Sequence, residues 1–118
     1  MSIKSYKDLI VWQKSILLVK EVFLLTEKFP KSELYGLCSQ LRRASISVPS
    51  NIAEGSGRKS LLERRQFYSI AYGSALEVET QIIIAKELFF AKPEDFASID
   101  IPLNEILRML NVMTARKT

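Results

Sequence analysis

The sequence contains no histidine and only one cysteine, Cys38, among its 118 residues. Without histidine the chain lacks the usual general base near neutral pH, so a Ser-His-Asp triad and a Cys-His dyad are both excluded. A lone cysteine forms no internal disulfide and, with no histidine beside it, no structural zinc site. We therefore expect no metal or other cofactor, a reducing cytoplasmic location, and a Cys38 side chain that acts as a small buried hydrophobe.

Long hydrophobic runs are absent as well. No segment reaches about 18 consecutive apolar residues, and the N-terminal stretch lacks a basic region followed by an apolar run and a small-residue cleavage site. We therefore expect neither a membrane span nor secretion. A hydrophobic content of 47% with 25% charged residues is typical of a globular protein, and residues 1–118 fit a single domain.

Apolar residues recur at steps of three and four in four segments, and no strand pattern or repeat interrupts them. This spacing predicts helices over about 8–28, 33–56, 61–90 and 94–115. The boundaries at Phe29-Pro30 and Lys92-Pro93 are short, so consecutive helices should be antiparallel neighbours. The predicted fold is all-α: an antiparallel, up-down-up-down four-helix bundle.

Each helix has a predicted core face, listed here in chain order. The seam of the first helix is Leu9, Trp12, Ile16, Val19 and Phe23, and a further apolar set lies off it: Val11, Leu18, Val22 and Leu25. The second face is Leu34, Leu37, Leu41, Ala44, Val48 and Ile52, the third Phe67, Ala71, Ser74, Val78, Ile82, Ala85 and Phe89, and the fourth Phe96, Ile99, Leu103, Ile106, Leu110 and Met113. Since one neighbour cannot cover both sets on the first helix, we expect contacts with other subunits and hence a homo-oligomer.

The second helix has several local signals. Ser32 is a suitable N-cap, and Pro49 lies inside the pattern, which predicts a kink without ending the helix. Gly55 and Gly57 should supply the positive φ angles that end the helix. Ser60, with Glu63 three residues later, has the spacing of a capping box for the third helix. Pro102 lies inside the fourth seam and predicts a kink or a break in its first turns.

Basic residues concentrate in the middle of the chain. Between positions 42 and 65 there are six basic and two acidic residues, an excess of four that equals the excess of the whole chain. Part of this set opens the third helix, where backbone N–H groups and the helix dipole favour anions such as phosphate. We therefore predict an RNA or DNA backbone contact through Arg42, Arg58, Lys59, Arg64 and Arg65. The alternative is a solvated loop and first helical turn.

A second set of polar residues suggests a structural role. Arg43, Ser47, Ser50 and Glu54 form a stripe roughly opposite the core side, and Glu54 precedes Arg58 by four residues, the favourable order for an ion pair. We expect Arg43 to pair with Glu54 or Glu77 in a partly buried network. The structural or interface set is therefore Arg43, Ser47, Asn51, Glu54 and Glu77, and the protein would then be a protein-protein interaction scaffold.

An enzymatic role has little support in the sequence. The segment 55–60 has glycines, a lysine and a serine before a helix, but one residue separates its glycines where a phosphate-binding loop needs four. The remaining acid-base candidates are Glu54, Glu77 and Glu79, which show no convergent ligand spacing. We therefore expect a non-enzymatic protein.

An ordered set of motifs resembles a known family. They are Tyr6, Leu9 and Trp12, then FPKSELYGL, QLRRA, SVPSNIAEG, Gly57-Arg58, and Gly73-Ser74 with Glu77 and Glu79, and together they span about residues 6–113. The chain resembles the small four-helix-bundle proteins encoded in intervening sequences of bacterial 23S rRNA genes, labelled S23. It is also similar to accessory proteins of diversity-generating retroelements, which bind nucleic acid and a reverse transcriptase. The resemblance implies a left-handed bundle and a ring-like homopentamer, and Pro102 departs from the family pattern.

Overall fold

The computed structural model describes residues 5–114 and is helical throughout. Its four α-helices are α1 (Ile10–Thr26), α2 (Leu37–Ser56), α3 (Leu61–Glu87) and α4 (Ala97–Thr114). Three short 3-10 turns accompany them: η1 (Tyr6–Asp8), η2 (Lys31–Glu33) and η3 (Pro93–Phe96). No strand occurs in the part of the chain that the model describes, so the prediction of an all-α four-helix fold is confirmed.

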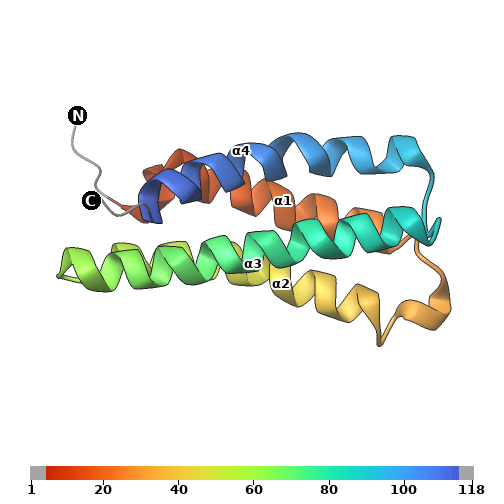
Figure 1. Cartoon of the computed structure of the whole chain (residues 1–118), viewed down its shortest axis with the longest axis horizontal. Helices are drawn as coiled ribbons and strands as arrows, with labels where there is room; N and C mark the ends of the chain where they lie inside the picture. Colours follow the sequence, from red (N-terminus) through yellow and green to blue (C-terminus); the bar gives the residue numbers. More distant parts are fainter. Residues whose placement is uncertain (1–4, 115–118) are drawn as a thin grey trace.

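The helices lie along the long axis of a body measuring 44 × 27 × 22 Å (Figure 1). Each helix packs against two others in the order α1, α2, α3, α4 and back to α1, with the most extensive contact between α2 and α3. Figure 1 shows the chain running along the body in alternating directions. The α2–α3 loop, residues 57–60, therefore lies at the same end as the start of α1 and the end of α4, and the other two links lie at the opposite end. The left-handed twist stays a prediction.

The buried face of α1 differs from the predicted seam. Val11, Leu18, Val22 and Leu25 are buried, whereas Ile16 of the predicted seam is 44% exposed. Both sets have helical spacing, so periodicity alone does not decide which one faces the core. The core face also includes Ser15, whose buried hydroxyl is satisfied because it donates to the Trp12 carbonyl at 2.8 Å.

Helix α2 begins later than predicted. Residues 31–33 form a single 3-10 turn, and Gly36, with φ −108° and ψ −114°, separates this turn from α2. Ser32 is therefore not the N-cap, and Leu34 is exposed. From Leu41 onward the predicted core positions are buried, and the helix continues without a break through Pro49. Continuity through this proline agrees with the prediction, whereas the kink itself stays a prediction.

Helix α3 ends at Glu87, before the predicted position 90. Phe89 follows with φ 56°, and the Phe90 N–H donates to the Ala85 carbonyl at 3.0 Å. With the Phe89 N–H bonded to the Lys86 carbonyl at 3.1 Å, this is a Schellman motif with phenylalanine where glycine is usual. As a consequence Phe89 is 87% exposed and does not join the predicted inner face.

Helix α4 follows its predicted heptad seam closely. Phe96, Ile99, Leu103, Ile106 and Leu110 are buried, and Met113 packs partly against the core. The helix runs without a break through Pro102, so the predicted break is not found, whereas a kink there stays a prediction. The predicted helix end at residue 115 lies outside the described residues.

Candidate nucleic-acid interface

The end of the bundle that carries the predicted basic residues depends on close packing at Gly55. This glycine is buried inside α2, and a Cβ added to it would lie 2.8 Å from Tyr68 Cε1 and 2.9 Å from Phe67 Cβ. No glycine has a positive φ, so the predicted reason for Gly55 and Gly57 is wrong. Gly55 lets α3 approach, and Gly57 caps α2 through its N–H, which reaches the carbonyls of Ala53 and Glu54 at 3.2 Å.

Ser60 starts α3 as predicted. Its hydroxyl oxygen accepts from the Glu63 backbone N–H at 3.1 Å, and the hydroxyl donates to the Glu63 carboxylate at 3.0 Å. The cap satisfies one of the free N–H groups at the helix start. The basic residues on either side are thereby fixed relative to a positive helix end.

Arg58 is held by two contacts at the α2–α3 loop. Its Nη2 donates to Glu54 Oε2 at 3.0 Å, which confirms the predicted pair, and its guanidinium carbon lies 4.6 Å from the centre of the Phe67 ring. Cation-π contact of this kind fixes the side chain without neutralising it. Because Glu54 offsets its charge, Arg58 is a positioned but partly compensated cation.

Arg64 has a structural role that sequence reasoning missed. Its Nε donates to the Arg58 carbonyl at 2.8 Å, and its Nη2 donates to the Lys59 carbonyl at 3.4 Å. The side chain therefore braces the α2–α3 loop from the first turn of α3. No spacing rule indicates this contact, since it depends on how the loop folds back over α3.

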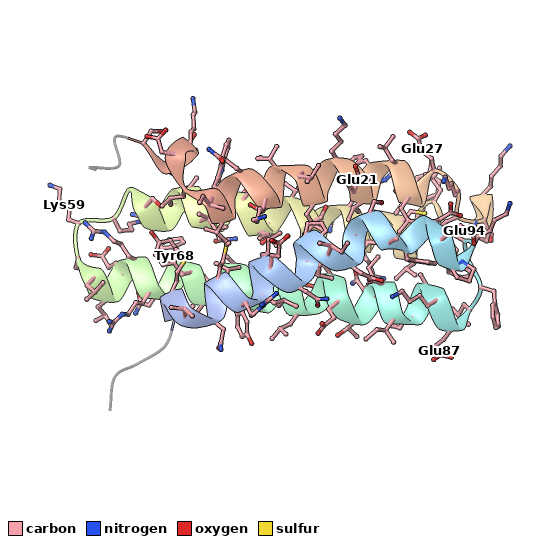
Figure 2. The ribbon with its side chains drawn as sticks, turned by 90° about the horizontal axis from the view of Figure 1, so that it is seen from above. Glu21, Glu27, Lys59, Tyr68, Glu87 and Glu94 are labelled. Atoms are coloured by element: carbon pink, nitrogen blue, oxygen red, sulfur yellow. The ribbon has the colours of Figure 1, made fainter. Side chains whose placement is uncertain are left out.

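Lys59 and Arg65 are the two basic residues of the segment 54–65 whose side chains have no partner among the described residues. Lys59 is exposed and points away from the tip of the bundle in Figure 2. Within residues 5–114, neither side chain makes a hydrogen bond or an ion pair. Both are therefore available for an external anion. We call Arg58, Lys59, Arg64 and Arg65 the basic end.

Arg42 does not belong to the basic end. Its Nε donates to Thr26 Oγ1 at 2.9 Å, and its guanidinium carbon lies 4.9 Å from the centre of the Phe23 ring. It precedes Arg58 by sixteen residues, about 24 Å along the axis of a helix. Arg42 thus joins α2 to α1, and its predicted place in the nucleic-acid contact is corrected.

The predicted ionic network around Arg43 does not form in the single chain. Arg43 is exposed and has no ion pair among residues 5–114, because Glu54 binds Arg58. Glu77 instead accepts a hydrogen bond from Gln81 Nε2 at 3.2 Å.

The small polar residues of the predicted structural set form a separate contact between α2 and α3. The hydroxyls of Ser47 and Ser74 are 2.8 Å apart, and Asn51 Nδ2 donates to Ser47 Oγ at 2.9 Å. Ser47 and Asn51 are half-buried. They thus face the neighbouring helix, and Ser47 does not lie on the side opposite the core as predicted.

Charge differs between the two ends of the bundle. The segment 54–65 holds four basic and two acidic residues, whereas the two links at the opposite end, residues 27–36 and 88–96, hold three basic and four acidic residues: Glu27, Lys28, Lys31, Glu33, Lys92, Glu94 and Asp95. Figure 2 shows the labelled carboxylates Glu27, Glu87 and Glu94 toward that opposite end, away from Lys59. A polyanion is therefore attracted more strongly to the basic end than to the opposite end.

Neither a metal-binding cluster nor a membrane-spanning helix is found within residues 5–114. No group of three or more histidine, cysteine, aspartate or glutamate side chains is arranged to hold a metal ion. In the same residues, no helix has both the length and the apolar character that crossing a membrane requires.

Comparison with known proteins supports the fold and identifies the family. The chain is similar to a crystal structure of a protein of unknown function from the S23 ribosomal protein family of Bacteroides thetaiotaomicron, with a TM-score of 0.80 and 19% identity over 91% of this chain and 100% of that chain. No protein of curated function matches. A family model described as 23S rRNA-intervening sequence protein matches residues 7–112. Since this match spans most of the sequence, the chain belongs to the 23S rRNA-intervening sequence protein family.

Proposed function

We propose that the protein is a non-enzymatic, cytoplasmic, homo-oligomeric bundle that binds the backbone of RNA or DNA through its basic end. The observation that carries this proposal is the pair Lys59 and Arg65 beside the N-terminus of α3, two cations whose side chains make neither a hydrogen bond nor an ion pair within residues 5–114. Free N–H groups and the dipole at a helix start add to the attraction for phosphate.

The other two arginines of the basic end support the site in a different way. Arg64 holds the loop carbonyls and Arg58 lies against Phe67, so the loop that carries Lys59 has a fixed shape. A fixed loop loses little conformational entropy when a phosphate binds. Contact with phosphates does not depend on base identity, so binding should be insensitive to sequence.

Oligomerisation multiplies a modest charge. Within the segment 54–65 one copy offers two cations without a partner among the described residues, which supports weak binding at best. Repeating the basic end around a ring, five times in the homopentamer that the resemblance implies, places many cations along one polyanion. Linked weak contacts then give an overall affinity far above that of a single contact.

A second candidate function is supported by the same geometry. Arg42, Arg58 and Arg64 all make contacts within the chain, as expected of structural arginines. If Lys59 and Arg65 are only solvated, the protein is a protein-protein interaction scaffold. The two functions differ in whether purified protein binds nucleic acid at low salt.

The decisive experiment measures binding of fluorescent RNA and DNA of mixed sequence by anisotropy, at about 50 mM and about 200 mM salt. The test variant is Lys59→Glu with Arg65→Glu. Its matched control is Lys31→Glu with Lys92→Glu, which makes the same change in net charge with two exposed residues at the opposite end. We expect wild type and control to bind with affinity that falls steeply with salt, and the test variant to lose binding. Absence of wild-type binding at the lower salt would favour the scaffold, and equal loss in both variants would move the site away from the basic end.

A further inference from the structure

Helix α1 carries an apolar stripe that the single chain leaves uncovered. Ile10, Leu17 and Leu24 are 59%, 46% and 49% exposed, and each follows the previous one by seven residues. Because seven residues are nearly two helical turns, the three side chains lie along one side of α1. We call Ile10, Leu17 and Leu24 the α1 stripe.

Helix α3 carries a second, uncovered line of residues at bundle-like spacing. Its members step by three and four and are all exposed: Ile70, Gly73, Glu77, Thr80 and Ile84. This line, the α3 outer seam, is distinct from the buried seam of the same helix that includes Ala71, Val78 and Ile82. A helix with two seams of this spacing is suited to packing on two sides.

Gly73 is the unusual member of the α3 outer seam. It lies in the middle of a 27-residue helix, and a Cβ added there would meet nothing within 4 Å. Glycine at such a position costs about 1 kcal/mol relative to alanine. No atom of residues 5–114 requires a glycine here, unlike at Gly55, which α3 crowds. A glycine in open space makes a hollow into which a side chain from outside can fit.

The α1 stripe and the α3 outer seam lie at matching positions along the bundle axis. Cys38 Sγ lies 3.6 Å from the Thr26 carbonyl oxygen, and Ser47 Oγ lies 2.8 Å from Ser74 Oγ, so each pair lies at one level. Leu17 precedes Thr26 by nine residues and Ser47 follows Cys38 by nine, on helices that run in opposite directions. At about 1.5 Å per residue on both helices, Leu17 and Ser74 therefore share a level.

From this match we infer that copies of the chain associate side by side, with the α1 stripe of one copy packed against the α3 outer seam of the next. Rotation about an axis parallel to the bundle preserves height, so Leu17 meets the hollow at Gly73. In the same register Leu24 falls between Thr80 and Ile84, as a knob does between ridges of a facing helix, and Ile10 falls about one turn before Ile70. This inference rests on the homo-oligomer in the proposed function and assigns its interface.

Charge complementarity supports a second copy as the occupant. The same register that brings Leu17 to the level of Ser74 brings Lys20 to the level of Glu77. Both side chains are exposed, and neither makes an ion pair within residues 5–114. The contact is heterologous, since different faces of the two copies meet, and such contacts build closed rings when the rotation closes.

The first test is the mass in solution by size-exclusion chromatography with light scattering. We expect wild type above the chain mass of 13.5 kDa, and Gly73→Leu and Leu17→Asp at 13.5 kDa with unchanged helical circular dichroism. The matched control is Ile83→Asp, an equally exposed isoleucine on α3 outside the seam, which should keep the wild-type mass. If Gly73→Leu fails to fold, Leu17→Asp alone decides. Wild-type mass in the folded seam variants, or a wild-type monomer at micromolar concentration, would overturn the inference.

The second test is a charge exchange between Lys20 and Glu77. Lys20→Glu and Glu77→Lys alone should each weaken association at least about tenfold, and the double variant should return to within about threefold of wild type. If the double variant loses as much association as the two single variants added together, the two residues do not contact each other. Mass and nucleic-acid anisotropy are separate readouts, so a wrong interface and an absent nucleic-acid site give different results.

Discussion

Gly55 of α2 and Phe67 of α3 are so close that a Cβ on the glycine would stand 2.9 Å from the Phe67 Cβ. Real Cβ atoms essentially never show contacts this short, and the second obstacle is the Tyr68 ring at 2.8 Å. The hydroxyl of this tyrosine is 3.0 Å from that of Ser56, so the ring is held from its far side. The separation of α2 and α3 at the basic end is therefore set by the missing side chain of one residue.

Gly55→Ala should accordingly destabilise the protein by about 1 to 3 kcal/mol, the usual cost of overpacking a close contact. Gly57→Ala is the control, because its nearest obstacle is the Glu54 carbonyl oxygen at 3.6 Å and its φ of −85° suits alanine. Urea unfolding followed by circular dichroism measures both. Equal midpoints for Gly55→Ala and wild type would show that the two helices can separate freely.

Arg64→Ala should lower the free energy of unfolding by about 1 kcal/mol, because it removes two hydrogen bonds to the loop carbonyls. Amide hydrogen exchange in residues 57–60 should quicken as well. Arg65→Ala is its control, since Arg65 has no such contact within the described residues and should leave both measurements as in wild type. Identical behaviour of the two variants would contradict a brace at Arg64.

Two adjacent arginines of α2 should differ in their effect on stability. Arg42→Ala removes a hydrogen bond to Thr26 and a cation-π contact with Phe23, so we expect a loss of about 1 to 2 kcal/mol. Arg43→Ala removes an exposed side chain without an ion pair in residues 5–114 and should change stability by less than about 0.5 kcal/mol. Thermal unfolding of both variants tests this. A larger loss of stability in Arg43→Ala than in Arg42→Ala would support the structural network that was predicted from the sequence.

Phe89→Gly should stabilise the protein by about 1 kcal/mol, because Phe89 occupies the left-handed region with φ 56° and is almost fully exposed. Leu88→Gly is the control: with φ −92° this position gains nothing from glycine, and the variant should be destabilised. Chemical unfolding separates the two outcomes. A loss of stability in Phe89→Gly would mean that the aromatic ring makes a contact worth more than the strain.

Asp95 gives the protein a defined sensitivity to acid. A hydrogen bond from Lys28 Nζ at 2.8 Å and a second from the Lys92 N–H hold the pKa of its carboxyl below the ordinary value of 3.8. Its contribution to stability is therefore present above pH 3.8 and is lost as the pH falls through the lowered pKa. The difference in unfolding midpoint between wild type and Asp95→Asn should shrink between about pH 5 and about pH 2. Glu94→Gln, at a neighbouring exposed carboxylate, serves as control, and a pH-independent difference for Asp95→Asn would contradict the linkage.

The sequence predicted most of the fold where a helix has one apolar stripe. In α4 the single heptad seam left no choice, and its residues are buried as expected. In α1 two apolar sets have helical spacing, and periodicity does not show which of them is buried. The buried face also contains Ser15, a polar residue whose hydroxyl is satisfied by a local hydrogen bond to a carbonyl. The start of α2 was missed because a good N-cap at Ser32 is overridden by the backbone of Gly36, which is set by the fold of the link.

The sequence predicted where the candidate site lies but not what each of its basic residues does. Charge counting located the basic residues, since it needs only positions along the chain. It could not show that Arg64 folds back onto the loop, or that Arg42 turns toward Phe23 on α1, because these contacts join residues by tertiary geometry. Spacing did predict two local contacts, Glu54 with Arg58 four residues apart and Ser60 with Glu63 three residues apart.

The order of the helices around the bundle has a consequence for the speed of folding. Three of the four helix pairs that pack together are consecutive in the chain, and only α1 with α4 joins distant segments. Chains rich in such local contacts have low contact order and reach the native state in microseconds to milliseconds. The extensive α2–α3 contact closes a loop of only four residues, so we expect this helical hairpin to form early and the α1–α4 seam, with the Lys14–Glu105 ion pair, to form last. A nascent chain could thus assemble its basic end before its final helix has left the ribosome.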